Sequence, residues 1–113
     1  MSNILDKIIA NKKIEVARQK SLVSISEMEK KITDIRINSF KAALADSATG
    51  IIAEFKRRSP SRDWIFKDAE ISDVIPLYSK NGASAISVLT DMDFFGGNLT
   101  DLAQARELTQ TPL

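Results

Sequence analysis

The feature that most constrains the fold is a short apolar stretch, 51–56, that ends in charged residues and is followed by a serine turn. Its β-branched and aromatic content predicts a buried strand. Side chains alternate between the faces of a strand, so Glu54 and Lys56 share one face with Ile52. The opposite face receives Ile51, Ala53 and Phe55. Because ligands of parallel α/β folds bind at the carboxyl ends of strands, the turn at 59–61 marks a candidate site.

Spacing alone leaves two interpretations of this charged pair open. In the first, Glu54 and Lys56 form an ordinary ion pair on a solvated strand face, because exposed charges seldom need a function. In the second, the pair and the serine turn converge on a substrate. Lys56 would then neutralise a carboxylate or donate a proton, and Glu54 would orient Lys56 or a substrate hydroxyl. Ser59 and Ser61 would hydrogen-bond polar substrate groups.

The composition is that of a soluble globular protein. The chain has 113 residues, of which 43% are hydrophobic and 27% charged, so one domain is the default expectation. Its net charge of +1 gives no general attraction to nucleic acid or to anionic membranes. No apolar run approaches the roughly 20 residues of a membrane span, and the first residues lack a signal-peptide layout. We therefore expect a cytoplasmic protein.

Cysteine and histidine are both absent from the sequence. Disulfides, thiolate nucleophiles, serine–histidine triads and the common zinc sites are therefore excluded. Acid–base chemistry would rest on Lys, Asp, Glu or Tyr side chains, with pKa values tuned by the site. The sequence contains neither a Walker loop nor a dinucleotide-binding glycine pattern.

The first part of the chain has the pattern of helices and connectors. Hydrophobic spacing predicts a helix from Asn3 to about Lys20, capped by Ser2 or Asn3, with one apolar stripe packed on a core. Shorter features follow: a helix within 21–32 whose capping box is either Ser24 with Glu27 or Ser26 with Glu29, a connector at 33–38, a helix over 40–45 capped by Ser39, and a loop at 46–50.

From residue 51 onward the expected elements alternate between strand and helix. They are a strand over 51–56, a long loop over 57–71, a helix over 73–80 capped by Ser72 with Pro76 near its first turn, a strand over 83–90, a loop over 91–97, a helix over 99–109 capped by Asn98, and the start of a third strand at 111–113. Such alternation favours a parallel sheet with right-handed crossovers. Three arginines, at 57, 58 and 62, make the long loop basic. That loop is either solvated or attracts an anionic substrate.

Two segments of the chain resemble the indole-3-glycerol-phosphate synthase family. The stretch 51–61, with Glu54, Lys56 and the serine turn, is similar to that family's first barrel strand and the loop after it. The stretch 86–97, which reads Ile-Ser-Val-Leu-Thr-Asp-Met-Asp-Phe-Phe-Gly-Gly, is similar to the second strand and its loop. The two segments occur in the family's order and at its expected separation, and the resemblance covers most of the chain.

The resemblance implies a (β/α)8 TIM barrel, in which residues 1–48 would be a helical extension and residues 49–113 the first two βα units. It implies a carbon–carbon lyase of tryptophan synthesis that acts without a metal or an organic cofactor. The enzyme closes the indole ring on 1-(2-carboxyphenylamino)-1-deoxyribulose 5-phosphate, a phosphorylated aromatic compound, with loss of carbon dioxide and water. Matching positions imply catalytic roles for Glu54 and Lys56. They imply substrate contacts for Ser59, Pro60, Leu89 and Phe95.

The sequence departs from the family pattern in two places. Where the family usually has a glycine, this chain has Asp63, which affects the conformation of the loop more than the chemistry. The family's acid lysine after the third strand, its general-base glutamate and its phosphate site have no counterpart in this sequence. We therefore expect the opening portion of the enzyme, inactive alone, with the outer edge of its second strand open to self-association.

Two other functions remain open on the sequence. The same residues suit a non-catalytic interaction module made of a partial barrel. Another phosphate-handling barrel enzyme, such as an isomerase of the same pathway, is the other alternative. The combination of Glu54, Lys56 and Ser59 argues against the isomerase.

Overall fold

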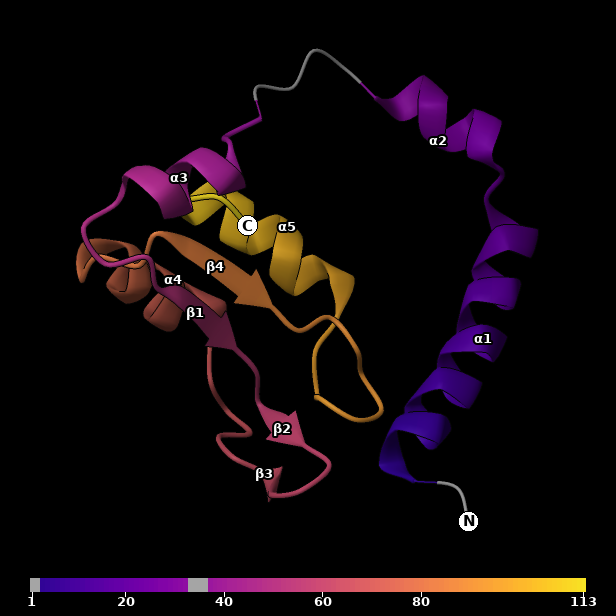
Figure 1. Ribbon diagram of the computed structural model, residues 1–113. Helices are drawn as coiled ribbons and strands as arrows, with labels where there is room; N and C mark the ends of the chain where they lie inside the picture. The colour runs from indigo at the N-terminus through magenta and orange to yellow at the C-terminus, as the bar shows by residue number, and fades with distance from the viewer. Residues whose placement is uncertain (1–2, 33–36) are drawn as a thin grey trace. The chain divides into compact units, whose positions relative to one another are not determined.

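The computed structural model describes residues 3–32 and 37–113, and the chain divides into two compact units, 1–36 and 37–113. The first unit contains helices α1 (Ile4–Leu22) and α2 (Ile25–Lys31). The second contains α3 (Phe40–Asp46), β1 (Ile52–Phe55), β2 (Arg58–Ser59), β3 (Asp63–Trp64), α4 (Ile71–Lys80), β4 (Ala85–Val88) and α5 (Leu99–Leu108) (Figure 1). The expected connector at 33–38 lies partly outside the described residues. The expected boundary at residue 48 stays a prediction.

Both helices of the first unit begin at a capping box. The Asn3 side chain accepts a hydrogen bond from the backbone N–H of Asp6 at 2.9 Å, and the Asp6 carboxylate accepts one from the N–H of Asn3 at 3.1 Å. Ser24 and Glu27 form the same reciprocal pair at α2, so this box forms rather than its alternative. Within its own unit α1 has no buried residue, and the packing of its apolar stripe on a core stays a prediction.

Two parallel strands organise the second unit. β1 pairs with β4 in parallel, and Figure 1 shows both arrows running the same way. In this register Glu54 lies opposite Ser87, and Phe55 lies opposite Val88. Helix α4 packs against β1 and α5, and α5 also packs against β4. The strand–helix–strand–helix order predicted from the sequence is confirmed, although each strand is shorter than expected.

The core lies between these strands and helices. Phe55 of β1 is 3% exposed and Ile86 of β4 is 0% exposed, and both face the helices. The remaining buried members of the cluster come from α4, α5 and the segment before α4: Ala69, Ile71, Ile75 and Ala105. Because strand side chains alternate, Glu54 and Ser87 project to the opposite face of the sheet.

Helix α4 begins earlier than the sequence suggests. The expected cap was Ser72, but the cap position is Glu70, which makes no side-chain capping bond, and the helix starts at Ile71. Ile71 and Ile75 are both 0% exposed and lie one turn apart, so burying both extends the helix toward its N-terminus. Pro76 therefore lies in the helix interior and not near the first turn. In the interior the missing N–H of proline costs more free energy than it would in the first turn.

The long loop after β1 contains a small hairpin, whereas its sequence predicts an irregular loop. β2 pairs with β3 in an antiparallel ladder, with Arg58 opposite Trp64. Asp63 turns the chain with a φ of 55°, the left-handed region that favours glycine. Aspartate tolerates this region better than most residues, and the Asp63 carboxylate accepts a hydrogen bond from Arg58 Nε at 2.6 Å. The loop thus keeps the turn without the glycine.

A third segment joins the outer edge of β4. The backbone N–H of Ile86 donates to the carbonyl of Pro112 at 2.9 Å, and Leu113 packs against the core cluster. Segment 111–113 therefore lies where a third strand would begin, as expected. The prediction that this outer edge stays open is wrong at Ile86. Within the described residues, the other edge of β1 has no strand partner.

Hydroxyl groups join the starts of the two parallel strands. Thr49 Oγ1 donates to the carbonyl of Gly82 at 2.7 Å, so in its 3.0 Å contact with Ser84 the serine is the donor. Ser84 can then only accept in its contact with Ser47. The result is a one-way chain of hydrogen bonds that fixes the end of the sheet farthest from the candidate site.

Candidate active site at the carboxyl ends of the strands

Glu54 and Lys56 form an ion pair at the carboxyl end of β1. Lys56 Nζ lies 2.7 Å from Glu54 Oε1, and the two side chains are 35% and 45% exposed respectively. The contact confirms that both side chains project from the same face of the strand. A half-exposed pair of this kind contributes little to stability, because water and ions screen it. The carboxylate and the ammonium are therefore accessible to a ligand.

The carboxyl end of β4 contributes to the same face. Ser87 is the register partner of Glu54, and Leu89 follows Ser87 by two residues, so alternation places both on the side of the ion pair. The N–H of Leu89 donates to the carbonyl of Phe55 at 3.0 Å, which continues the ladder to this level. Leu89, expected to line an apolar pocket, is half-buried beside the charged pair.

The serine turn does not present its first hydroxyl freely. Ser59 is 8% exposed, and its Oγ accepts a hydrogen bond from the backbone N–H of Arg62 at 3.2 Å. Its Oγ also lies 3.4 Å from Ser61 Oγ, so its proton can be directed there or to a ligand. Pro60, at the tip, is exposed. Hydrogen bonds within the turn therefore hold the Ser59 hydroxyl in place, whereas Ser61 is exposed to solvent.

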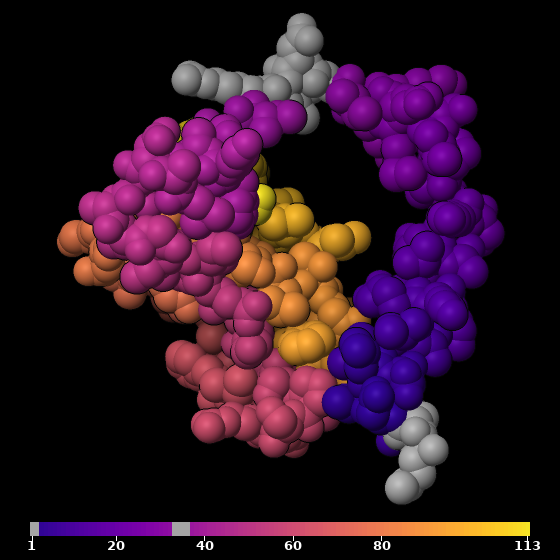
Figure 2. Space-filling view, in the orientation of Figure 1, coloured from indigo at the N-terminus to yellow at the C-terminus, as the bar shows by residue number. Residues whose placement is uncertain are grey.

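The loop after β4 lies against the hairpin. The N–H of Arg58 donates to the carbonyl of Phe95 at 3.2 Å, and Figure 2 shows the two loops in contact at the surface. Phe94 and Phe95 are both half-buried. A Cβ built at Gly97 would lie 1.9 Å from the carbonyl oxygen of Leu89, so only glycine fits there. The described geometry therefore holds Ser59 and Phe95 in neighbouring loops.

Arg57, the residue after Lys56, connects the two loops to a helix. Its guanidinium forms a two-pronged ion pair with Asp101 at the start of α5, with contacts of 2.6 and 3.1 Å. Nε also donates to the carbonyl of Ala69 at 2.8 Å, and Nη1 donates to that of Gly96 at 3.2 Å. The hydrogen bond to Asp101 raises the pKa of Arg57 above its ordinary value, and partial burial works against that rise. Arg57 is therefore a fixed structural cation.

The other arginines of the loop differ in their environment. Arg58 pairs with Asp63, donates to the carbonyl of Asp93 at 3.1 Å and stacks over Trp64. Arg62 is exposed. The sequence left open whether this basic loop is solvated or attracts an anionic substrate. Neither interpretation describes Arg57 and Arg58, because both form ion pairs within the protein.

Neither Ser87 nor the pair of Arg57 with Asp101 is identified by the sequence patterns described above. Applying the alternation rule to the second strand as well as the first would have identified Ser87, because its parity matches that of Leu89. The ion pair joins residues 44 positions apart, and no local pattern predicts which acidic residue a loop arginine will meet.

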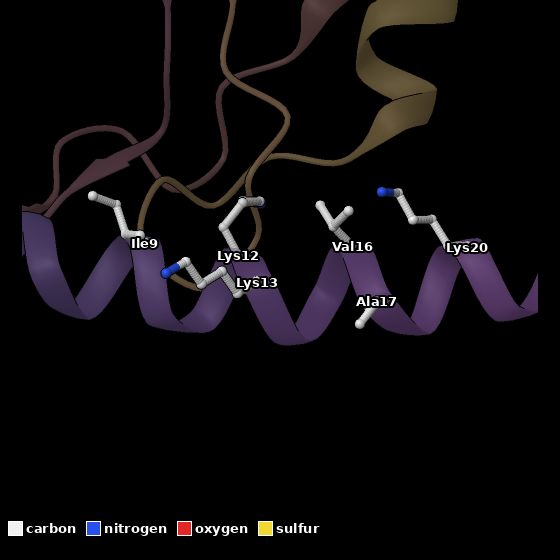
Figure 3. Close-up of a pocket in the computed structure, with 6 residues that line it drawn as sticks. All are labelled: Ile9, Lys12, Lys13, Val16, Ala17 and Lys20. Carbon is white, nitrogen blue, oxygen red and sulfur yellow. The ribbon is translucent and has the colours of Figure 1, made fainter.

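A hollow in the surface along α1 is not a candidate site. Its lining residues come from this one helix: Ile9, Lys12, Lys13, Val16, Ala17 and Lys20. Figure 3 shows Ile9, Lys12, Val16 and Lys20 projecting to one side, as their helical spacing requires. A hollow formed by one helix is a surface feature, whereas the site at β1 and β4 draws on several elements.

Within residues 3–32 and 37–113, no cluster of acidic, histidine or cysteine side chains could hold a metal ion. The same residues form no helix long and apolar enough to cross a membrane.

The fold and the site together define part of a βα-barrel: parallel strands alternate with helices, and polar groups gather at the strands' carboxyl ends. A family model described as indole-3-glycerol phosphate synthase matches residues 5–113. The chain belongs to the indole-3-glycerol phosphate synthase family. The family match also argues against the alternative of another phosphate-handling barrel enzyme.

Curated relatives agree with the family match. An indole-3-glycerol phosphate synthase of Bacteroides thetaiotaomicron is 49% identical, and the match covers 100% of this chain and 44% of that protein. Synthases of Prochlorococcus marinus and Alkaliphilus metalliredigens are 40% and 42% identical, with 39% and 43% of their lengths covered. The chain thus spans about two fifths of the length of these relatives.

Proposed function

We propose that this chain supplies the first strands and part of the active site of an indole-3-glycerol phosphate synthase. The reaction would be ring closure on 1-(2-carboxyphenylamino)-1-deoxyribulose 5-phosphate, with release of carbon dioxide and water. It is a carbon–carbon lyase reaction of tryptophan synthesis. A cytoplasmic location accompanies this proposal as a prediction.

The observation that carries the proposal is the accessible ion pair at the end of β1. Lys56, 2.7 Å from Glu54, offers a positive charge for the substrate carboxylate or a proton for the leaving oxygen. Glu54 orients that ammonium through the ion pair and can accept a hydrogen bond from a substrate hydroxyl. Catalytic roles for Glu54 and Lys56 therefore remain our proposal.

The remaining site residues would enclose the substrate. Leu89 shares the sheet face of the ion pair, and Phe95 lies in the loop bonded to the hairpin. We propose that both contact the aromatic ring, since apolar side chains beside a few polar groups suit such a ligand. Ser59 and Pro60 would contact the substrate from the turn above the pair.

A chimeric enzyme tests the proposal. In it, this chain replaces the matching 44% of the Bacteroides thetaiotaomicron synthase, which is 49% identical to it. We expect the chimera to form indole-3-glycerol phosphate, and Glu54→Gln and Lys56→Met each to lower kcat by roughly a hundredfold or more. Lys41→Met, which removes an exposed charge on α3 outside the candidate site, is the control and should leave kcat unchanged. A folded chimera without turnover, or one indifferent to both changes, would refute the proposal.

The chain alone should show no turnover. Its described residues supply a short parallel sheet, whereas a barrel closes around eight strands. The assay is indole-3-glycerol phosphate formation by the purified chain at high concentration. Any rate above the background that Lys56→Met abolishes would contradict this expectation.

A second candidate role is self-association through the unpaired edge of β1. Ile51 and Leu77 beside that edge are 55% and 56% exposed, and an exposed apolar strand edge invites pairing with another chain. The Tyr78 hydroxyl occupies one outward carbonyl, that of Glu54, at 3.1 Å. We therefore expect concentration-dependent dimers in sedimentation, fewer with Leu77→Glu and more with Tyr78→Phe. A monomer at all concentrations would exclude this role.

A further inference from the structure

Ser87 is the polar residue that β4 presents to the face of the ion pair. It is the register partner of Glu54 in the parallel ladder, and neighbouring strands lie about 4.8 Å apart. Its strand neighbour Ile86 turns to the opposite side and is 0% exposed in the core. By alternation, the β4 residues on either side of Ser87 on its own face are apolar: Ala85 and Leu89.

The hydroxyl of Ser87 is not used by the fold. The residue is half-buried, and its hydroxyl makes no hydrogen bond to another residue that the structure describes. The hydroxyls of two other serines are used by the fold. Ser59 accepts a hydrogen bond from the N–H of Arg62, and Ser84 belongs to the hydroxyl chain at the opposite end of the sheet. A serine hydroxyl can both donate and accept, which neither the ammonium of Lys56 nor an ionised Glu54 can do.

We propose that Ser87 is a substrate-binding residue, whose hydroxyl bonds an oxygen atom of the substrate in the layer of Glu54. This inference rests on the proposed synthase function and extends it by a residue. The side chains of Ala85 and Leu89, on either side of Ser87 on this face of β4, are apolar, so a polar substrate atom that reaches this part of β4 would be hydrogen-bonded by Ser87. Removal of the hydroxyl would leave that atom unpaired in a site that excludes water, which lowers binding and rate.

Two substitutions of nearly equal shape isolate the hydroxyl. In the chimeric enzyme, Ser87→Thr keeps an oxygen at this position and Ser87→Val replaces it by a methyl group, so steric effects of the branched side chain cancel. We expect kcat/KM of Ser87→Val to be roughly tenfold or more below that of Ser87→Thr, with Ser87→Ala lowered as well. Thermal unfolding midpoints of the threonine and valine variants should agree, because the fold does not use the hydroxyl.

The results of these experiments distinguish the role of Ser87 from the synthase function on which it rests. An active chimera that loses turnover with Glu54→Gln, but treats Ser87→Val and Ser87→Thr alike, overturns the role of Ser87 and leaves the synthase function standing. A folded chimera that is inactive with its own serine overturns both. An active chimera in which only the valine and alanine variants fall supports the assignment.

Discussion

Arg57 sets the geometry around the candidate site without taking part in it. Its side chain turns away from the face of Lys56 and bonds Asp101, Ala69 and Gly96, so that both loops and the start of α5 share one cation. The side chains of Arg57 and Asp101 are 13% and 7% exposed. At that degree of burial, the removal of one partner leaves a charge that water cannot reach well.

Loss of either partner should destabilise the second unit. We expect Asp101→Asn and Arg57→Met each to lower the free energy of unfolding by about 3 kcal/mol, because each leaves the buried charge of the other residue without its counter-charge. Urea denaturation followed by Trp64 fluorescence measures this. Asp68→Asn, at an exposed position, should change stability by less than about 0.5 kcal/mol. Equal losses of unfolding free energy in Asp68→Asn and Asp101→Asn would show that the ion pair of Arg57 with Asp101 does not stabilise the fold.

Among the helices, those with local start signals were predicted best. Asn3, Ser24, Ser39 and Asn98 each cap the helix that follows, and each bond lies within three residues of sequence. The start of α4 was mispredicted at Ser72, because burial of Ile71 decides it and burial depends on distant residues. The hairpin was missed for a similar reason, since Trp64 packs on Gly96, far along the chain.

The capping box of α2 gives this helix a pH dependence. Hydrogen bonds from the backbone and side chain of Ser24 lower the pKa of Glu27 below its ordinary value. A lowered folded-state pKa means that the stabilisation is present above the unfolded value and is lost as the pH falls through the folded value. We therefore expect the amide signals of 25–28 to shift toward unfolded positions below about pH 4.5, measured by NMR. In Glu27→Gln this acid transition should be absent; if it persists, another group causes it.

For the whole molecule, the parallel arrangement and the charged face followed from the sequence alone. Alternation within β1 predicted that Glu54 and Lys56 share a face, and their contact confirms it. Contacts between distant segments were beyond such reasoning. The pair of Arg57 with Asp101 and the closure of the outer edge of β4 by Pro112 both depend on how the chain folds back. The roles of Ser59, Pro60, Leu89 and Phe95 stay predictions.

Amide exchange tests whether the chain's last residues belong to the sheet. The N–H of Ile86 donates to Pro112 at 2.9 Å, and the N–H of Leu89 donates to Phe55 at 3.0 Å, on opposite edges of the same strand. We expect both amides to exchange slowly and at similar rates in deuterium oxide, because each hydrogen bond must open first. Fast exchange at Ile86 with protection at Leu89 would show that segment 111–113 does not pair with β4.

The tight return of the chain at Gly97 limits how this protein can be redesigned. The carbonyl of Leu89 occupies the space where any side chain at that position would begin. A combinatorial library that varies loop 91–97 to admit new substrates must therefore hold residue 97 invariant. Diversity can be placed at Met92, which is 68% exposed, without competing for that space.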